Sequence, residues 1–172
     1  NELLVNCYTA PAQVKYSNGK IYSWTTDQGL VGNKTRVSLQ TKKGDLWSGT
    51  TTGLSLIKSD GSIKNYTASQ GFDNEYIMCL FEDAAGQIWV GTDGGGIYIL
   101  KDRQIVKHYT SNDGLAGNVI FKISTLNNNE IWITTGTGIS KYIEYVDSFQ
   151  NLNSSNGLGS DGIFQMICDY TQ

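Results

Sequence analysis

The sequence predicts an all-β protein built from about four repeated four-stranded β-propeller blades. Near-copies of a Gly-x-Ile-Trp-x-Gly-Thr box recur around Trp47, Trp89 and Trp132, at intervals of 42 and 43 residues. A second marker, a glycine followed by a large apolar residue, recurs at Gly29, Gly71, Gly114 and Gly157, at intervals of 42, 43 and 43 residues. Two different motifs that keep one period of about 40 to 50 residues are typical of propeller blades.

The composition favours short strands joined by tight turns. The 172 residues include 20 glycines and one proline, and 11% of them are aromatic. The net charge of −3 gives no electrostatic reason to expect nucleic acid as a partner. No apolar run approaches the roughly 18 residues of a membrane span, so we expect no membrane insertion of this stretch. The chain starts at Asn1 without an initiator methionine, and we interpret it as a piece of a longer protein.

The first two repeats follow one another directly along the chain. Residues 3–25 match the last three strands of a blade, at 3–7, 12–16 and 20–25, with Leu4 in the place of the tryptophan. Residues 34–67 match a complete blade. Its strands are expected at 34–41, 45–50, 53–58 and 62–67, with turns at Lys43-Gly44 and Asp60-Gly61.

Residues 75–110 form the repeat that is easiest to read. Its first strand, 76–83, is almost continuously apolar, as expected for a strand buried on both faces. Gly86 then provides a turn, because glycine takes positive φ without steric cost. The remaining strands are expected at 88–92, 96–100 and 105–109.

The last repeat, 118–151, is followed by an extra strand. Strands are expected at 118–126, 130–135, 138–143 and roughly 145–151, and residues 162–169 match the first strand of another blade. Two alternatives follow. The extra strand completes the first blade and closes a four-blade ring, or the whole of residues 1–172 is one segment of a larger propeller.

The repeat resembles the two-component regulator propeller family. The resemblance is carried best by Ser69-Gln70-Gly71-Phe72, the strand ending at Asp83, the box from Gly86 to Thr92, and Tyr109-Thr110. The Tyr-Thr pair of the fourth repeat is expected at Asn151-Leu152. The resemblance implies the periplasmic sensor region of a hybrid histidine kinase of the Bacteroides type, often one that senses polysaccharide breakdown products. No histidine-kinase catalytic motif lies within these residues, so we expect no catalysis and no cofactor in this chain.

Several conspicuous residues have a simpler structural explanation. The repeated tryptophans are expected to fill the space between blades, and Trp24 is also expected to pack in the core. His108, the single histidine, has no cysteine or carboxylate partner at motif spacing, which argues against catalysis. Cys7, Cys79 and Cys168 are unevenly spaced, which argues against a disulfide framework or a metal site.

Candidate ligand-binding residues are sought in the loops that join strands four to one and two to three, which lie on one face of a propeller. Polar or aromatic residues that do not repeat are preferred there, since packing already explains the repeating ones. Sugar recognition needs an aromatic face with planar hydrogen-bonding groups nearby. This criterion selects Tyr8, Asp27, Lys34, Arg36, Asn74, Tyr76, Asp93, Asn118 and Asp161.

The repeat predicts a propeller segment, and the resemblance implies that this segment is non-catalytic, periplasmic and ligand-sensing, with an oligosaccharide as the expected ligand. The first alternative is an interaction scaffold that forms homo-oligomers through blade edges and binds no small molecule. The second is a propeller lyase or hydrolase, which the lone histidine disfavours.

Overall fold

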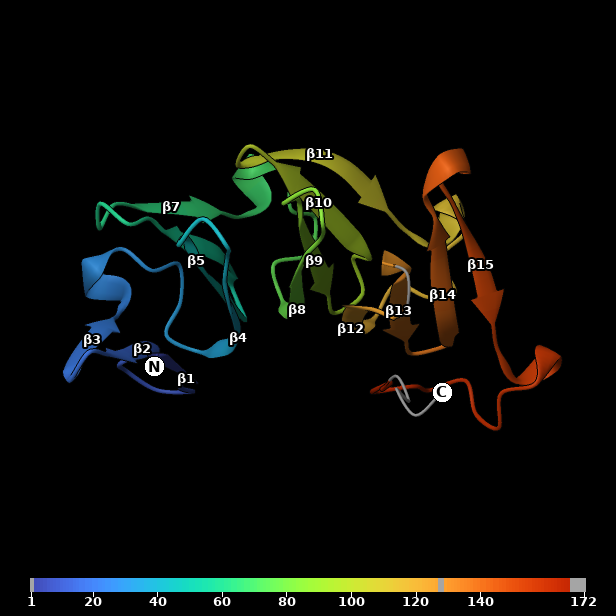
Figure 1. Cartoon of the computed structure of the whole chain (residues 1–172), viewed down its shortest axis with the longest axis horizontal. Coiled ribbons are helices and arrows are strands. Elements are labelled where there is room, and N and C mark those ends of the chain that lie inside the picture. The colour runs from blue at the N-terminus through green and yellow to red at the C-terminus, as the bar shows by residue number, and fades with distance from the viewer. Residues whose placement is uncertain (1, 127–128, 168–172) are drawn as a thin grey trace. The chain divides into compact units, whose positions relative to one another are not determined.

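The computed structural model describes residues 2–126 and 129–167, and these residues form four antiparallel sheets (Figure 1). The prediction of an all-β propeller-blade fold is confirmed. The chain divides into two compact units, residues 1–78 and 79–172, which we describe separately. The expectation of one propeller segment over all of residues 1–172 stays a prediction. None of the helices in the described ranges is long and apolar enough to span a membrane.

The first unit contains two sheets. One has the order β1-β2-β3, with β1 Glu2–Asn6, β2 Gln13–Ser17 and β3 Lys20–Trp24. The other has the order β4-β5-β6-β7, with β4 Thr35–Gln40, β5 Leu46–Thr50, β6 Gly53–Ile57 and β7 Ile63–Tyr66. A cluster around Ala12, Leu30, Leu46 and Ile57 is the core that the sheets share, and Trp24 packs against it as expected.

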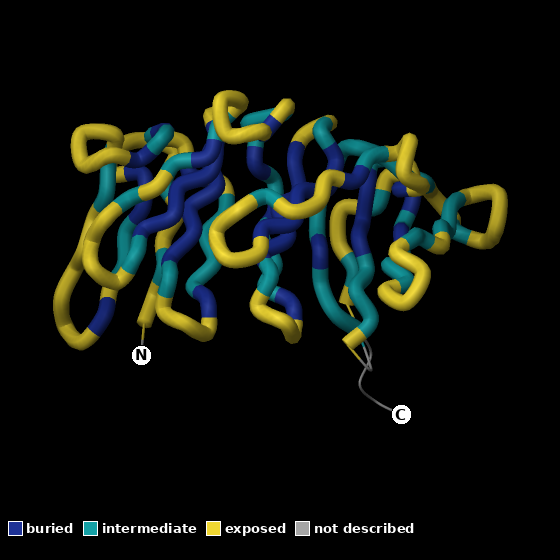
Figure 2. The backbone as a smooth tube through the Cα atoms, turned by 90° about the horizontal axis from the view of Figure 1, so that it is seen from above, coloured by how far each residue is buried: buried dark blue, intermediate teal, exposed yellow. Residues whose placement is uncertain are grey.

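The second unit contains the other two sheets. The first strand of the third sheet starts two residues before this unit begins at residue 79. The third sheet comprises β8 Ile77–Glu82, β9 Ile88–Thr92, β10 Ile97–Lys101 and β11 Gln104–Tyr109. The fourth comprises β12 Ile120–Thr125, β13 Ile131–Thr135, β14 Gly138–Ile143 and β15 Ser148–Leu152. The middle strands are the most buried, β9 along its whole length, whereas the outer strand β11 is largely exposed (Figure 2).

The recurring tryptophans differ in burial. Trp89 is 2% exposed, and its ring lies edge-on to that of Tyr142 in the fourth sheet, with centroids 5.1 Å apart. It therefore fills the space between the two sheets, as the repeat predicted. Trp47 is equally buried and packs on Tyr66. Trp132 is only half-buried, with the Lys141 ammonium 5.5 Å from its ring centroid.

The glycine of the first two boxes has a packing role, and the threonine that ends all three boxes has a hydrogen-bonding role. A Cβ added to Gly91 would lie 2.5 Å from Cys79 Sγ and 2.6 Å from Ile120 Cγ2, so only glycine lets the strands approach this closely. The buried threonine hydroxyls that follow donate at 2.9 Å to a carbonyl at or just before the start of the next strand: Thr50 to Gly53, Thr92 to Gly96, and Thr135 to Gly138. The box thus fixes both neighbouring elements.

The second marker proves to be a capped 3-10 helix. Such helices occur at η1 Thr26–Gln28, η2 Ala68–Gln70, η3 Ser111–Asp113 and η6 Ser154–Asn156. Each begins with a capping box on Thr25, Thr67, Thr110 or Asn153, and each ends at the marker glycine in the left-handed conformation, with φ between 97° and 117°. The apolar residue that follows is buried in three cases: Leu30, Phe72 and Leu115.

The strand bounds agree closely with the expected ones, with two corrections. The cap of the fourth repeat is Asn153, so the counterpart of Tyr109-Thr110 is Leu152-Asn153 and not Asn151-Leu152. The strand expected from residue 145 begins at Ser148, because a further 3-10 helix, η5 Glu144–Val146, and the left-handed Asp147 precede it.

The C-terminal segment differs from the strand expected at residues 162–169. Residues 162–167 form no strand, and residues 168–169 lie outside the described residues. The Ile163 N–H donates to the Thr135 carbonyl at 3.2 Å, and Phe164 packs on Phe121. An equivalent bond occurs between the first two blades, where the Thr35 N–H at the start of β4 donates to the Cys7 carbonyl at 2.9 Å. Residues 162–167 therefore lie beside the fourth sheet where the first strand of a following blade would start.

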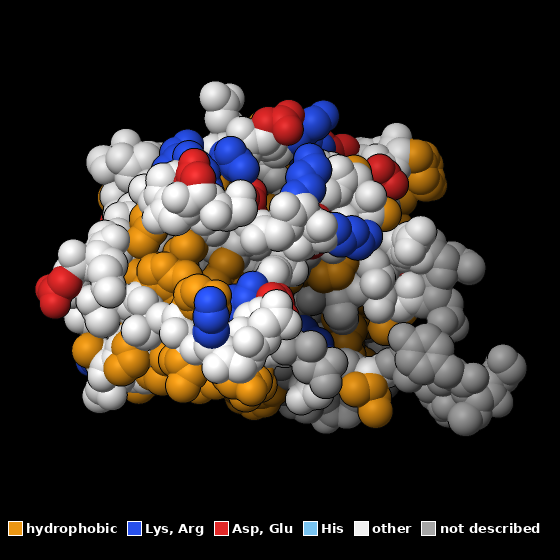
Figure 3. All heavy atoms as spheres, turned by 60° about the vertical axis from the view of Figure 1, so that its left-hand side comes forward, with side chains coloured by type: hydrophobic (Ala, Val, Ile, Leu, Met, Phe, Trp, Pro, Cys, Tyr) orange, Lys and Arg blue, Asp and Glu red, His pale blue; other side chains and the backbone are white. Residues whose placement is uncertain are grey.

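The N-terminal sheet presents an apolar surface. The large apolar side chains on it that are at least 40% exposed are Leu3, Val5, Tyr16, Ile21 and Tyr22, and Ile21 reaches 74%. Figure 3, which brings this end of the chain forward, shows hydrophobic side chains gathered on the surface.

Candidate functional site

Arg36 projects from a bulge near the start of β4. Thr35 pairs with Thr50 and Val37 pairs with Gly49, so Arg36 is the extra residue between the two pairs. The same irregularity falls between Ile120 and Lys122 in the fourth sheet. A bulge turns a side chain away from its regular alternation and often occurs beside a functional site.

The chain after β1 is held against the bulge by three hydrogen bonds. The Thr35 N–H donates to the Cys7 carbonyl at 2.9 Å, and the Asn6 side-chain amide donates to the Arg36 carbonyl at 3.4 Å. Asn6 Oδ1 accepts from the Ser38 hydroxyl at 2.7 Å. Tyr8 follows Cys7 in the chain, so these backbone and side-chain bonds place its ring next to the Arg36 side chain.

Tyr76 reaches the same point from the loop before β8. Its N–H donates to Asn74 Oδ1 at 3.0 Å, which fixes the turn that leads into the strand. Arg36 Nη1 donates to the hydroxyl oxygens of Tyr8 at 3.0 Å and Tyr76 at 2.9 Å. The guanidinium carbon also lies 5.2 Å from the centroid of the Tyr76 ring, within the range of a cation–π contact.

This tyrosine–arginine cluster, Tyr8, Arg36 and Tyr76, is positively charged and open to solvent. Tyr8 is 52% exposed, and Arg36 and Lys34 are also exposed. The neighbouring Tyr76 hydroxyl, together with the Arg36 and Lys34 charges, lowers the pKa of Tyr8. An aromatic face beside planar donors is the combination that recognition of a sugar requires.

The structure thus brings together Tyr8, Arg36 and Tyr76, with Asn74 as the turn residue behind Tyr76 and Lys34 close enough to act on Tyr8. Of the other sequence-selected residues, Asp27 has a different role in the first unit, and Asp93, Asn118 and Asp161 belong to the second unit. Asp27 lies in η1, where its N–H bonds Thr25 Oγ1 at 3.1 Å. Asp93 belongs to the second unit and forms an isolated antiparallel bridge with Val119.

Asn118 and Asp161 occupy a repeated structural position. Their Oδ1 atoms accept the N–H of the first residue of a 3-10 helix, Ser111 at 2.6 Å and Ser154 at 2.5 Å. Asn33 and Glu75 make the same bond to Thr26 and Ala68 in the first unit. Asn118 and Asp161 were selected because their residue types do not repeat. The hydrogen bond that they make does repeat, so the structure of the loop already explains their presence.

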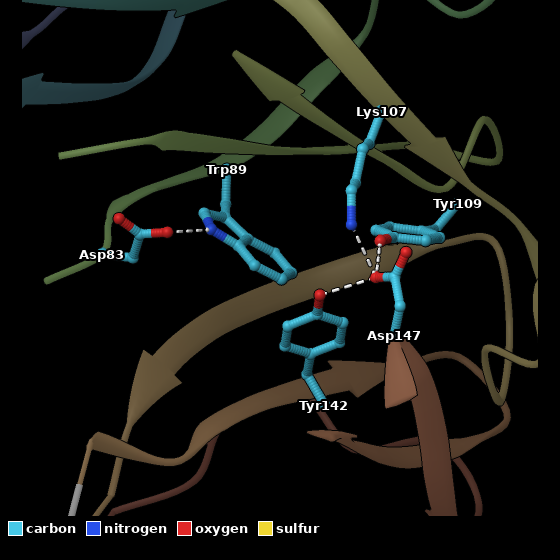
Figure 4. Close-up of polar contacts among 6 residues, drawn as sticks. All are labelled: Asp83, Trp89, Lys107, Tyr109, Tyr142 and Asp147. Carbon is cyan, nitrogen blue, oxygen red and sulfur yellow. Dashed lines mark hydrogen bonds and ion pairs between the residues drawn. The ribbon is translucent and has the colours of Figure 1, made fainter. Parts of the chain in front are cut away.

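A second polar cluster, in the second unit, was missed by the sequence analysis (Figure 4). Asp147 Oδ1 accepts hydrogen bonds from Lys107 Nζ at 2.7 Å, from the Tyr142 hydroxyl at 2.6 Å and from the Tyr109 hydroxyl. These bonds, that of Lys107 first, lower the pKa of Asp147 to about 2. Burial raises the pKa of both tyrosines. Because the partners lie up to 40 residues from Asp147, no local sequence signal could have found the cluster.

A hollow of about 360 Å³ lies beside this cluster, lined in part by Asp83, Gln87, Trp89, Lys107 and Tyr142. Several of its polar groups are already bound within the protein: Lys107 and Tyr142 donate to Asp147. Asp83 caps the turn after β8 by accepting the Gln87 N–H at 2.8 Å, and its other oxygen accepts from Trp89 Nε1 at 2.9 Å (Figure 4). We interpret this arrangement as a structural contact that holds the third and fourth sheets together. The tyrosine–arginine cluster is therefore the stronger candidate for a ligand site.

The single histidine is engaged in the sheet. His108 stacks on Tyr98, with centroids 4.0 Å apart, and its Nε2 lies 2.7 Å from the Gly95 carbonyl oxygen. Cys79 is buried, and burial raises the pKa of its thiol to about 12. Neither group is placed as a reactive acid, base or nucleophile.

Comparison with known proteins supports the fold. Residues 71–94 match the family model described as "Two component regulator propeller". No curated protein sequence matches the chain. Among solved structures, an extracellular domain assigned to the hybrid two component system BT3049 of B. thetaiotaomicron is 24% identical, with a TM-score of 0.81 over 94% of this chain and 23% of that one.

Two further structures have the same fold. The extracellular domain assigned to the hybrid two component system BT4673 of B. thetaiotaomicron is 19% identical, with a TM-score of 0.69 over 87% of this chain and 24% of that one. Virginiamycin B lyase from Staphylococcus aureus is 18% identical, with a TM-score of 0.69 over 88% of this chain and 52% of that one. The chain thus spans about a quarter of the two extracellular domains.

Proposed function

We propose that this chain, which carries a two-component regulator propeller repeat at residues 71–94, is a sensory segment of the extracytoplasmic region of a hybrid two-component system. The match to that family is the observation that carries the proposal. The fold shared with extracellular domains of such systems supports it. The compartment would be the periplasm, and the segment would bind its ligand without chemical conversion.

The tyrosine–arginine cluster is the ligand-binding surface in this proposal. Tyr8 and Tyr76 offer phenol rings, and Arg36 offers a planar group of donors whose position is fixed by the bulge. We propose an oligosaccharide as the ligand. Its binding would favour one arrangement of the sensor region over another, and the difference in affinity between the two arrangements would set the size of the signal.

A melting experiment tests this proposal. The 172-residue chain is heated alone and with a panel of oligosaccharides. A ligand at about 100 times its dissociation constant adds about 2.7 kcal/mol, which should raise the midpoint by about 5 to 10 °C in a domain of this size. Tyr8→Ala should abolish the shift. Tyr145→Ala, which removes an aromatic residue 89% exposed in the second unit, is the matched control and should retain it.

A panel in which every oligosaccharide leaves the midpoint unchanged would contradict ligand sensing by this segment. Equal losses in Tyr8→Ala and Tyr145→Ala would instead contradict the assignment of the site. The melting profile of each variant without ligand shows whether it is folded.

The apolar surface of the N-terminal sheet favours a second candidate function, a scaffold that associates with another copy of the chain. Leu3 and Ile21 are 58% and 74% exposed there. Sedimentation velocity over a range of concentrations tests this candidate function. We expect the chain to form a dimer and Ile21→Glu to disrupt it. A monomer at all concentrations would contradict it.

A further inference from the structure

We infer that the ligand of the tyrosine–arginine cluster carries an anionic group, so that the oligosaccharide is an acidic one with carboxylate or sulfate substituents. This inference rests on the proposed sensing function and narrows it to one class of ligand. The unused donors of Arg36, the charges around it and the fixed position of its side chain favour an anionic ligand.

Arg36 uses only part of its hydrogen-bonding capacity within the protein. A guanidinium has five N–H donors, and in Arg36 the two tyrosine hydroxyls both accept from Nη1. Among residues 2–126 and 129–167, no hydrogen bond is made by Arg36 Nη2 or Nε. Those atoms form the edge of the guanidinium that binds a carboxylate or a sulfate with two parallel hydrogen bonds.

The charge of Arg36 is not neutralised by the protein. Within the described part of the chain, no carboxylate forms an ion pair with Arg36, whose side-chain interactions are all with the two tyrosines. Lys34 adds a second positive charge, which acts on the Tyr8 hydroxyl. Glu75, the carboxylate adjacent to Tyr76 in sequence, is turned to the Ala68 N–H at 2.7 Å. The cluster is therefore locally cationic in a chain of net charge −3.

The donor edge is also held in place before a ligand arrives. The Arg36 backbone lies in the bulge, its carbonyl is bound by Asn6, and its Nη1 is fixed by two tyrosine hydroxyls. A long side chain fixed in this way loses little further entropy on binding, which favours a directional contact over a loose one. The exposed Tyr8 ring can then contact the face of the sugar that bears the anionic group.

Three probes distinguish the ligand classes in calorimetric titrations of the 172-residue chain: trigalacturonate, a carrageenan tetrasaccharide that carries sulfate and no carboxylate, and neutral galactotriose. We expect at least one acidic probe to bind about 10-fold or more tightly than galactotriose, because hydrogen bonds to charged groups are the strong ones. The affinity should fall as salt is added. The preferred acidic probe identifies the anionic group.

Substitutions connect that affinity to the cluster. Arg36→Gln should weaken the acidic probe about 10-fold or more. Arg36→Lys should recover only part of the loss, since it keeps the charge and lacks the planar edge. Lys43→Gln is the matched control, because it removes an exposed cation of the same unit in the turn after β4, and it should leave the affinity unchanged.

The outcomes separate this inference from the sensor proposal. Galactotriose binding as tightly as both acidic probes, or equal effects of Arg36→Gln and Lys43→Gln, overturns the acidic ligand and leaves an oligosaccharide sensor standing. Failure of all three probes to bind overturns the acidic ligand, while the wider melting panel decides the sensor proposal separately.

Discussion

At the scale of single residues, Thr134 is where the chain departs from its own repeat. It replaces the glycine of the Trp-x-Gly-Thr box, it is fully buried, and its Oγ1 has no hydrogen-bond partner among residues 2–126 and 129–167. A buried hydroxyl without a partner costs about 1 to 3 kcal/mol. We expect Thr134→Val, which has the same shape and lacks the hydroxyl, to raise the free energy of unfolding by about 1 kcal/mol.

Thr135 is the control for that measurement. Its Oγ1 donates to the Gly138 carbonyl and accepts the Thr137 N–H, so Thr135→Val should lower the free energy of unfolding by about 1 to 3 kcal/mol. Urea unfolding of both variants checks the pair. A loss of stability in both would show that Thr134 has a partner after all.

Asp147 gives a prediction of pH dependence. Its hydrogen bonds lower its pKa in the folded protein to about 2, below the value of about 3.9 in an unfolded chain. The stability that it contributes is therefore fully present above about pH 4 and is lost as the pH falls toward 2. Because the side chain is 48% exposed, solvent screening makes this contribution modest.

We expect Asp147→Asn to be less stable than the parent chain at pH 7 and to approach it at pH 2. Asparagine is chosen because the residue has φ 53°, a left-handed conformation that asparagine tolerates. Thermal melting at pH 7, 4 and 2 measures the difference. A difference that stays constant between pH 7 and pH 2 would contradict a role for the carboxylate charge.

At the scale of elements, the marker glycines should be required for their backbone conformation alone. Gly114 ends η3 with φ 99°, and a Cβ there would meet nothing within 4 Å. Gly114→Ala should therefore lower the free energy of unfolding by about 1 to 2 kcal/mol through the left-handed strain. Gly159→Ala, also in open space and without a positive φ, should change it by less than about 0.5 kcal/mol in urea unfolding. Equal effects would contradict this explanation.

The strands were predictable because each strand boundary occurs in several copies of the repeat, and these copies can be compared with one another. The 3-10 helices were not predicted, although their signal, a Thr or Asn followed three residues later by Gln, Asp or Asn, is present in the sequence. The bulge at Arg36 has no such signal. It depends on how β4 pairs with β5, which the residue type at position 36 does not reveal.

The candidate site shows the same limit. Tyr8, Arg36 and Tyr76 were selected as residues that do not repeat, and they meet because three separate elements converge. Asn118 and Asp161 were selected by the same rule, although oxygen acceptors of differing residue type perform one repeated task. A rule based on residue identity therefore misses a structural hydrogen bond that repeats in the fold with different residue types.

At the scale of the whole molecule, strand β8 contributes to both compact units. Ile77, which is fully buried, would lie 2.6 Å from a Cβ on Gly49 in the first unit, and Cys79 belongs to the core of the second. Because one continuous strand serves both, we expect the chain to unfold in a single cooperative transition. Its calorimetric and van't Hoff enthalpies should then agree.

Two matched substitutions test that expectation from either side. Gly49→Ala overpacks the first unit, and Gly91→Ala overpacks the second, where the new Cβ would lie 2.5 Å from Cys79 Sγ. Each should cost about 1 to 3 kcal/mol. In a cooperative chain both substitutions lower the midpoint of the same transition. Two heat-absorption peaks, with Gly49→Ala moving only one and Gly91→Ala only the other, would show that the units unfold independently and that a ligand bound at Arg36 stabilises the first unit alone.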